Sequence, residues 1–224
     1  MSEIPEDHPR ATSLKIRHKL IEGMHNNIVT EAGLIAHGRG EAYDYLIGEK
    51  THDFALQSIS AAAALIYISD HPVLSINGNT AILCPKEMIK FSKICNVPME
   101  INLFYKSPGR LEAISNHLKN LGATNLLGID EEFYDSIEQL SSYRRIADNR
   151  GIKIADTVIV PLEDGDRTKA LKNNHKKVIT IDLNPLSRTA QQADITIVDN
   201  VIQVFPILIE KYNNITSKTE AQTI

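Results

Sequence analysis

Short apolar runs recur along the chain, and most of them are continuous rather than alternating with polar positions. They lie at residues 34–36, 73–76, 101–105, 125–129, 157–161, 178–183 and 195–198. Continuous apolar runs are typical of strands that are buried on both faces, as in a parallel sheet. The pattern therefore predicts a strand at each of these runs.

Stretches with helical spacing of apolar residues separate many of the runs. They cover residues 53–69, 85–93, 108–121, 167–172 and 201–212, and another at 13–27 comes first, with Ser13 as its expected N-cap. Alternation of strands and helices predicts an α/β, doubly wound fold. We expect a mostly parallel sheet with helices on both faces and an N-terminal helical segment.

The same pattern predicts one nucleotide- and substrate-binding α/β domain over residues 31–212. Residues 1–30 are expected to form an arm and a helix that pack on this domain, and residues 213–224 a frayed polar tail. Residues 131–154 are polar and are expected to form a surface helix or an insertion.

Charge and hydropathy exclude several classes of protein. The net charge of -4 argues against a nucleic-acid binder, because phosphate contacts dominate the affinity of such proteins. The start, "MSEIPEDHPR", is too polar for a secretory signal. The longest apolar-leaning run, residues 59–68, is about half as long as a membrane span. We therefore expect a soluble, cytoplasmic protein.

Several familiar motifs are missing from the sequence. It contains no GxxxxGK[ST] loop, which argues against a P-loop enzyme, and no GxGxxG after the first predicted strand, which argues against a nicotinamide dehydrogenase. It also contains no GxSxG, the sequence of a nucleophile elbow. The cysteines, Cys84 and Cys95, form no CxxC pair. They are expected to be small core residues rather than nucleophiles.

Polar loops follow several predicted strands, at the positions where open α/β sheets bind ligands. The loops contain "HGRG" (37–40), "NGN" (77–79), "EDGDRT" (163–168), "DLNPLSRT" (182–189) and "DN" (199–200). Their arginines and carboxylates together suit a polyanion that is handled with a divalent metal or an amine.

Each loop also has a purely structural interpretation. "HGRG" could be a tight turn with Arg39 facing solvent, and "NGN" is a common turn sequence. Asp166 and Asn184 are suitable N-caps for the helices that follow them. Composition and position alone therefore predict a phosphate-rich small-molecule site and no more.

Seven stretches carry a resemblance to a known family. They are "IPEDHPR", "IEGM", "AGLIAHGRGEAYDYLIGE", "INGN", "MEINLFY", "VPLEDGDRTKAL" and "VITIDLNPLSRTAQQADITIVDN", in order from residue 4 to residue 200. They resemble archaeal phosphopantothenate synthetase, also called 4-phosphopantoate–β-alanine ligase. Residues 131–154 and the tail lie outside the resemblance. The resemblance implies a Rossmann-like fold and a homodimer.

The resemblance also implies a reaction. The family joins 4-phosphopantoate to β-alanine with ATP, giving 4'-phosphopantothenate in coenzyme A biosynthesis. The expected route passes through a phosphopantoyl-adenylate and releases AMP and pyrophosphate, and an acyl phosphate with release of ADP is the alternative. A nucleotide-binding regulatory module without turnover, or a sugar-phosphate isomerase or transferase, are competing hypotheses.

The resemblance places the ATP site residue by residue. The expected contacts are Arg17, Arg39, Asp182, Leu183, Asn184, Arg188, Thr189, Asp199 and Asn200. Two anionic reactants repel each other, so we expect the arginines and Mg2+ to bring them together. Asp182 is expected at the ribose or the metal, and the asparagines and Asp199 at the adenine edge or the ribose.

The remaining site residues are predicted from chemistry. The expected substrate contacts are Asn77, Lys86, Glu163, Asp166 and Arg167. The catalytic group is expected to comprise Arg39, which would hold phosphate oxygens, together with His37 and Asp164, which would orient the β-alanine ammonium and take its proton. The sequence does not identify the metal ligands.

Overall fold

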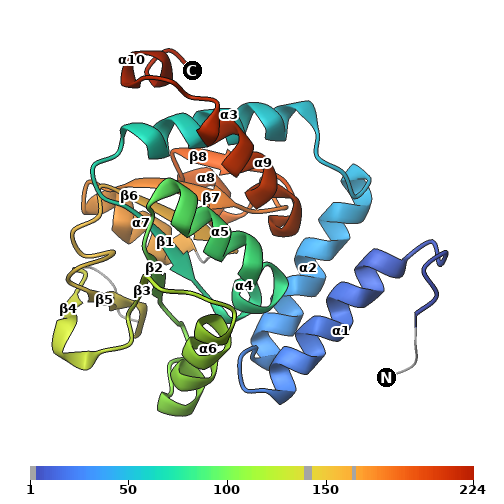
Figure 1. Cartoon of the computed structure of the whole chain (residues 1–224). Helices are drawn as coiled ribbons and strands as arrows, with labels where there is room; N and C mark the ends of the chain where they lie inside the picture. Colours follow the sequence, from blue (N-terminus) through green and yellow to red (C-terminus); the bar gives the residue numbers. More distant parts are fainter. Residues whose placement is uncertain (1–3, 139–142, 163–164) are drawn as a thin grey trace.

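A six-stranded parallel sheet forms the centre of the molecule (Figure 1). The computed structural model describes residues 4–138, 143–162 and 165–224. The strands are β1 (Pro72–Ile76), β2 (Met99–Ile101), β3 (Leu126–Leu127), β6 (Thr157–Pro161), β7 (Lys177–Ile181) and β8 (Ile195–Ile197). Their order is β3-β2-β1-β6-β7-β8, with all neighbours parallel. The chain reverses its direction of progress between β1 and β6, which confirms the doubly wound, Rossmann-like fold.

The strands bury both faces, as the continuous apolar runs predict. Val73, Val158 and Val178 are in register across three strands and belong to the core on one face. Their neighbours in sequence belong to the core on the other face: Leu74, Ile159 and Ile179. Successive side chains of a strand point to opposite faces, so both sets are removed from water.

Helices cover the two faces unequally. The larger core lies under α3 (Asp53–Ile68), α5 (Pro85–Cys95) and α9 (Val201–Asn213), and Phe91 and Phe205 pack against each other there. The other face is covered by α7 (Gly165–Asn173) and by an insertion. The remaining helices of the sheet domain are α4 (Gly78–Leu83), α6 (Pro108–Asn120) and α8 (Arg188–Gln192). In the part of the chain that is described, no helix has the length and apolar character needed to cross a membrane.

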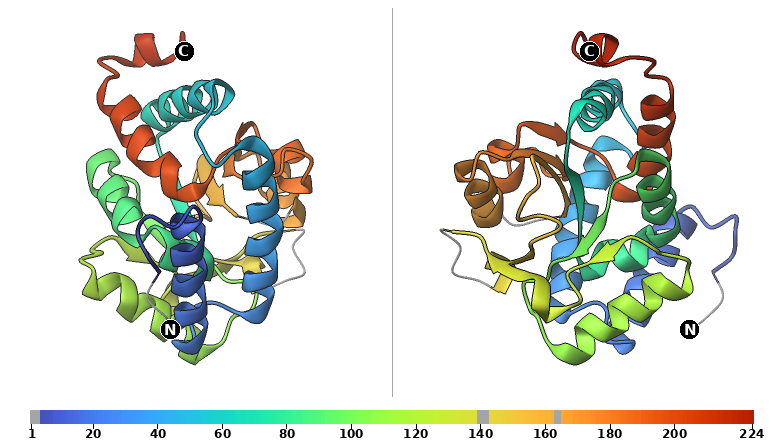
Figure 2. Two further views of the ribbon diagram at one scale, coloured as in Figure 1. Left: turned by 90° about the vertical axis from the view of Figure 1, so that its right-hand side faces the viewer. Right: turned by 60° about the vertical axis from the view of Figure 1, so that its left-hand side comes forward.

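The first two of the three helices described before β1 lie beside each other and pack on α4 (Figure 2). They are α1 (Ala11–His25) and α2 (Glu31–Ile47). The helix α1 begins at Ala11, with Arg10 in the N-cap position, so the prediction that Ser13 is the cap is wrong. Ser13 lies inside the first turn, where its hydroxyl donates to the carbonyl of Arg10 (3.3 Å).

The helix α2 replaces the first predicted strand and the "HGRG" turn, so both of those predictions are wrong. The Thr30 side chain caps it by accepting from the N–H of Gly33, and it ends at Gly48, which has φ 92. Three interior glycines made this segment resemble a turn, because each costs about 1 kcal/mol relative to alanine in a helix. One of them is closely packed, since a Cβ on Gly33 would lie 2.5 Å from Asn79 Oδ1.

The polar segment 131–154 is an insertion without an α-helix in its described residues. It forms an antiparallel pair, β4 (Tyr134–Ser136) with β5 (Ile146–Asp148), and two short 3-10 turns at Glu131–Phe133 and Tyr143–Arg145. Glu100 of β2, which is fully buried, accepts hydrogen bonds from the backbone N–H of Asp148 (3.0 Å) and Ile152 (2.6 Å). The alternative of an insertion is therefore confirmed, and Glu100 holds it to the sheet.

The C-terminal tail is anchored rather than frayed. Ile215 and Ala221 are buried in the larger core, and α10 (Lys218–Ala221) packs on α3. The Ser217 side chain caps this short helix by accepting from the N–H of Glu220. Two buried apolar residues are enough to fix a segment whose composition is otherwise polar.

Candidate functional site

A cavity of about 620 Å³ lies where the strand order reverses. One wall consists of residues that follow the strands: Asn77–Asn79 after β1, Leu103–Tyr105 after β2, Leu162 and Gly165 after β6, Asp182–Asn184 after β7 and Asn200–Gln203 after β8. Residues of α1 and α2 form the opposite wall. The cavity therefore occupies the position at which doubly wound sheets bind their ligands.

The backbone beside the cavity is held in place at the reversal. The Asn77 amide donates to the carbonyl of Pro161 (2.8 Å), and its oxygen caps α4 by accepting from the N–H of Thr80 (3.0 Å). Leu162 has φ 53, a left-handed conformation that costs a branched residue of order 1–3 kcal/mol. Its N–H donates to the carbonyl of Ile181 (3.1 Å), so the strained residue is fixed by both neighbouring strands.

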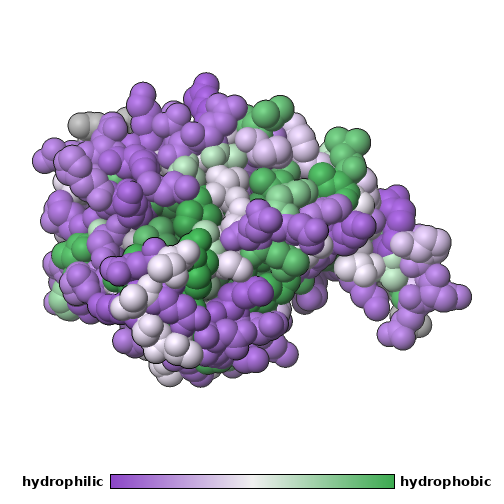
Figure 3. Space-filling model, turned by 90° about the horizontal axis from the view of Figure 1, so that it is seen from above, coloured by the Kyte–Doolittle hydropathy of each residue, from purple (hydrophilic) through white to green (hydrophobic). Residues whose placement is uncertain are grey.

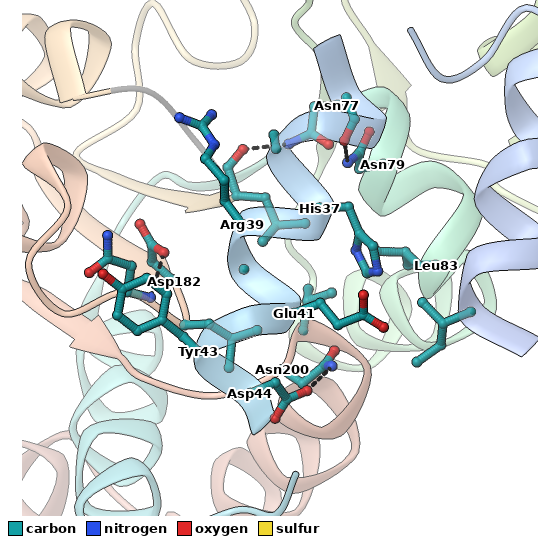
Figure 4. A pocket seen from close by; sticks show the side chains of 18 of the residues that line it. His37, Arg39, Glu41, Tyr43, Asp44, Asn77, Asn79, Leu83, Asp182 and Asn200 are labelled. Carbon is teal, nitrogen blue, oxygen red and sulfur yellow. Dashed lines mark hydrogen bonds between the residues drawn. The ribbon is translucent and has the colours of Figure 1, made fainter. Parts of the chain in front are cut away.

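The helix α2 carries many of the polar side chains in the cavity (Figure 4). Arg39 and Tyr43 lie on one side of it, near Asp182. His37 and Glu41 lie on the other side, near Leu83. The helix thus presents two chemically different faces to the same space.

Arg17 reaches the cavity through Glu41. Its Nε and Nη2 donate to the two oxygens of Glu41 (2.9 and 2.8 Å), and Tyr45 joins the cluster by donating to the same carboxylate. The hydrogen bond to Glu41 raises the pKa of Arg17. A nucleotide phosphate that binds Arg17 has to share or replace this carboxylate.

His37 is a half-buried imidazole beside this ion pair. Its Nε2 is buried and makes no hydrogen bond with any described residue. Burial lowers the pKa of His37, against the opposing attraction of Glu41. A neutral imidazole with a vacant nitrogen can accept a proton from a bound amine.

The loop after β7 folds back on its own carboxylate. Asp182 accepts hydrogen bonds from the Asn184 N–H (3.0 Å) and from the Ser187 hydroxyl, and burial raises the pKa of Asp182. Asn184 is not a helix cap, so that interpretation is wrong. The helix α8 begins at Arg188, and the Ser187 hydroxyl caps it by accepting from the N–H of Ala190 (3.0 Å).

The loop after β8 connects to α2. The Asn200 amide donates to Asp44 Oδ2 (2.7 Å), and its oxygen caps α9 by accepting from the N–H of Ile202 (3.2 Å). Asp199 is buried beneath this loop, where it accepts from the Thr51 hydroxyl (2.7 Å), and burial raises the pKa of Asp199.

Two arginines that the sequence analysis did not single out line the cavity beyond β2. Arg110 of α6 donates to the carbonyls of Ile28 (3.0 Å) and Tyr105 (2.7 Å), and burial lowers its pKa. Arg144 of the insertion is also buried, with its guanidinium 5.8 Å from the ring centre of Phe104. Both come from segments that do not directly follow a strand, so a search of strand ends could not find them.

The structure brings most of the predicted ATP contacts together. The predicted residues in the cavity lining are His37, Arg39, Asn77, Asp182, Leu183, Asn184, Arg188, Thr189 and Asn200. Arg17 and Asp199 are not in the lining, but Arg17 donates to Glu41 and Asp199 accepts from the N–H of Asn200, and both of those partners are in it.

Three predicted substrate contacts lie outside the lining. Lys86 is exposed in the first turn of α5. Arg167 is fully buried under the sheet, where it donates to the Ser75 hydroxyl (2.9 Å). Asp166 is exposed and lies 3.5 Å from Arg188. The other two predictions in that loop, Glu163 and Asp164, fall outside the described residues.

Comparison with known proteins identifies the family. A model described as "Phosphopantothenate/pantothenate synthetase" matches residues 54–224. The chain belongs to this family. The resemblance drawn from the loop sequences is therefore confirmed.

Curated members of the phosphopantothenate synthetase family are similar over nearly the whole chain. A protein of Thermococcus kodakarensis named 4-phosphopantoate--beta-alanine ligase is 49% identical over 94% of this chain and 80% of its own length. Proteins with the same name from Thermococcus onnurineus (50%, over 94% and 80%) and Methanosarcina mazei (46%, over 90% and 78%) are comparable. The match to the Thermococcus kodakarensis protein covers 211 residues, more of the chain than the family model covers.

The synthetase cavity has few metal ligands of its own. Within residues 4–138, 143–162 and 165–224, no three His, Cys, Asp or Glu side chains are grouped to hold an ion. Mg2+ commonly binds through one or two carboxylates and the phosphates of a substrate. Asp182 is a carboxylate in the cavity lining that an ion carried by a substrate phosphate could reach.

The two cysteines have no part in the site. Cys84 and Cys95 are free thiols buried in the larger core. Burial raises the pKa of Cys95 to about 12 and also raises the pKa of Cys84, so neither thiolate forms near neutral pH. Their expected role as small core residues is confirmed.

Proposed function

We propose that this protein is an ATP-dependent ligase that joins 4-phosphopantoate to β-alanine and forms 4'-phosphopantothenate for coenzyme A biosynthesis. Curated relatives that carry this name are 46–50% identical and cover most of the chain. One observation of the structure supports the proposal above others. The cavity has arginines on both halves of the sheet, which suits two anionic substrates that must meet.

We assign ATP to the half formed by β6, β7 and β8. Arg188 at the start of α8 and Arg39 on α2 offer planar guanidinium groups to the phosphates. Asp182 and Asn200 lie at the ends of the adjacent strands β7 and β8, where doubly wound folds hold the nucleoside. Mg2+ accompanies the nucleotide as part of the substrate.

We assign 4-phosphopantoate to the half formed by β1, β2 and β3. Arg110 and Arg144 take the role that the sequence analysis gave to Lys86 and Arg167. Both are buried, so their charges are little screened by water. The phosphate of phosphopantoate at these arginines would direct its carboxylate toward ATP across the reversal.

The reaction then follows in two steps. A carboxylate oxygen of phosphopantoate attacks the α-phosphorus of ATP, and pyrophosphate leaves as the acyl-adenylate forms. The β-alanine ammonium gives a proton to the vacant Nε2 of His37, and the neutral amine attacks the acyl carbon. The amide forms as AMP leaves and the second proton of the attacking amine passes to solvent. Arginines that face the phosphates stabilise the charge that develops in the first step.

The active form is proposed to be a homodimer. The resemblance to the family implies one, and α2 offers a surface for it. Ile35 and Leu46 of this helix are 67% and 81% exposed. Figure 3 shows that hydrophobic residues reach the surface seen from above in separate patches among hydrophilic ones.

The test is product formation by the purified protein. With ATP, Mg2+, 4-phosphopantoate and β-alanine, mass spectrometry should detect 4'-phosphopantothenate, and chromatography should detect AMP and pyrophosphate. Each substrate is omitted in one arm. Product without ATP would contradict a ligase, and ADP in place of AMP would contradict the adenylate. Binding of ATP in calorimetry without product from any arm would favour the regulatory module instead.

A further inference from the structure

Asp44 is a buried carboxylate in the cavity with one oxygen unused. Its residue is 6% exposed, and it is the one buried residue among the 17 of α2. Asp44 Oδ2 accepts from the Asn200 amide (2.7 Å), while Oδ1 is buried and accepts no hydrogen bond from any described residue. A buried acceptor without a donor is destabilising, so a ligand that donates to Oδ1 removes this loss.

Asn200 is the neighbour that fixes the orientation of this acceptor. Its amide oxygen is used by the N–H of Ile202 at the start of α9, which leaves its NH2 group to face Asp44. One N–H of that group binds Asp44, and the second remains as a donor. The pair therefore presents one acceptor, Asp44 Oδ1, beside one donor, the second N–H of Asn200.

The pairing edge of adenine carries the complementary groups in the same order. Its exocyclic amino group is a donor, and the ring nitrogen beside it is an acceptor. Guanine and hypoxanthine present an oxo group and a ring N–H at these two positions, so both contacts would become repulsive. Next to the pair, Val201 and Ile202 line the cavity with apolar side chains that suit the faces of a base.

A nucleotide whose base binds at Asp44 can also reach the arginines of the cavity with its phosphates. His37 and Asp44 are seven residues apart on α2, so they share one face and lie about 10 Å apart along the axis. The base edge and the α-phosphate of a nucleotide are separated by a comparable distance. Phosphates that reach the level of His37 along the helix axis would also be at the level of Arg39, whose side chain leaves α2 on the side of Asp182.

We propose that Asp44 Oδ1 accepts a hydrogen bond from the exocyclic amino group of adenine and, with Asn200, makes the enzyme specific for ATP over 6-oxopurine nucleotides. The inference rests on the proposed function, since it assigns the base of the nucleotide that the ligase uses. It goes further by naming a specificity residue on α2, outside the loops that follow the strands.

The test compares nucleotides in the wild-type protein and in Asp44→Asn. The wild type should use ATP better than inosine triphosphate, and also better than purine riboside triphosphate, which lacks the amino group, each by about 10- to 100-fold in kcat/KM. In Asp44→Asn the amide oxygen can keep the bond from Asn200, which preserves the fold, and the NH2 group then faces the base. We expect the preference for ATP over inosine triphosphate to fall by about 10- to 100-fold.

A matched control is Asp53→Asn at the exposed first turn of α3, outside the cavity lining, which should leave all the ratios unchanged. Unchanged ratios in Asp44→Asn, at a melting temperature near that of the wild type, would overturn the inference. A change confined to 2'- or 3'-deoxy-ATP would overturn it as well and assign Asp44 to the ribose. If no nucleotide supports product, the ligase proposal fails, and calorimetric affinities for the same nucleotides still decide the role of Asp44.

Discussion

At the scale of single residues, the charged groups of the cavity differ in how far they are already paired. Arg17 is paired with Glu41, and one oxygen of Asp44 accepts from the Asn200 amide. Arg39 is exposed on α2 and lines the cavity. The exposed guanidinium of Arg39 can bind phosphates without first breaking a strong interaction with another residue.

Arg39→Ala should reduce kcat/KM for ATP by about 10²–10³, since that is the typical cost of losing one donor that stabilises developing charge. The melting temperature should change little, because the side chain is exposed. Lys90→Ala, which removes an exposed charge on α5 outside the cavity lining, is the control for net charge. A large loss of thermal stability in Arg39→Ala would make the residue structural instead.

The residues that the sequence analysis missed share a physical reason. Asp44, Arg110 and Arg144 reach the cavity from a helix interior, a helix start and an insertion, and only the folded chain brings them beside the strand ends. One signal was available for Asp44, because it repeats the face of His37 after two helical turns. That signal requires the segment to be recognised as a helix first.

At the scale of elements, most of the buried strands were predictable and the glycine-rich helix was not. The run at 157–161 is continuous and apolar because both of its faces are covered, and it matches β6 residue for residue. The glycines of α2 weaken its intrinsic helix propensity, and contacts with α1 and α4 decide its state. The loop "NGN" behaves similarly, since Gly78 opens α4 rather than a turn.

Gly78→Ala tests this close packing. A Cβ at Gly78 would lie 2.2 Å from the carbonyl oxygen of Ile28 and 2.5 Å from Arg110 Nη2. Overpacking of this kind typically costs about 1–3 kcal/mol, so urea unfolding should show a loss of that size. Displacement of Arg110 should also raise KM for 4-phosphopantoate.

Gly109→Ala is the matched control. Its nearest contact would be Asn27 Nδ2 at 3.5 Å, and the residue lies in the first turn of α6. Alanine there should leave stability unchanged or increase it by up to about 1 kcal/mol. Equal losses of stability in Gly78→Ala and Gly109→Ala would mean that the close contact between Ile28 and Gly78 is not the cause of the loss.

Glu100, which holds the insertion to β2, makes stability depend on pH. Burial raises the pKa of Glu100 from 4.5 to about 7, although the N–H groups of Ile152 and Asp148 oppose the shift. Between these values the unfolded state has lost the proton and the folded state keeps it. The contribution of this group is therefore complete below pH 4.5 and declines, by about 3 kcal/mol in total, as pH rises to 7.

We expect the free energy of unfolding of the wild type to fall more steeply between pH 5 and 8 than that of Glu100→Gln. In Glu100→Gln an NH2 group replaces one of the two oxygens that accept from the N–H groups of Asp148 and Ile152. The variant should therefore be less stable than the wild type at low pH, and the difference in the free energy of unfolding should narrow as pH rises. Urea titrations at several pH values measure both slopes. Parallel slopes would show that Glu100 is not protonated in the folded state.

At the scale of the whole molecule, the order of the strands determines where the cavity lies. Separate halves of one sheet meet at β1 and β6, and each half brings its own arginines to the junction. Strand–helix alternation predicted the doubly wound class. It could not predict that α1 and α2 form the opposite wall, because that contact joins segments with no shared pattern.

The outer face of α2 is the surface that we expect a second copy to cover. Ile35 and Leu46 lie on this face, and Phe54 at the start of α3 is 48% exposed. Large contiguous apolar patches are rare on the surface of monomeric soluble proteins and often mark interaction sites. A twofold contact brings the same residues of two chains together, so a charge introduced there would be repeated across the interface.

Ile35→Glu with Leu46→Glu should therefore convert a dimer into a monomer in sedimentation and light scattering, with little change in the circular dichroism spectrum, because both side chains already face solvent in one chain. Ile94→Glu, which charges an exposed apolar position on α5, should leave the dimer intact. A double variant that stays dimeric would place the interface elsewhere. A monomeric variant that keeps full activity would show that each chain completes its own cavity. A monomeric variant with a raised KM for ATP would mean that the partner helps to hold α2 in place, and with it Arg39, against the nucleotide.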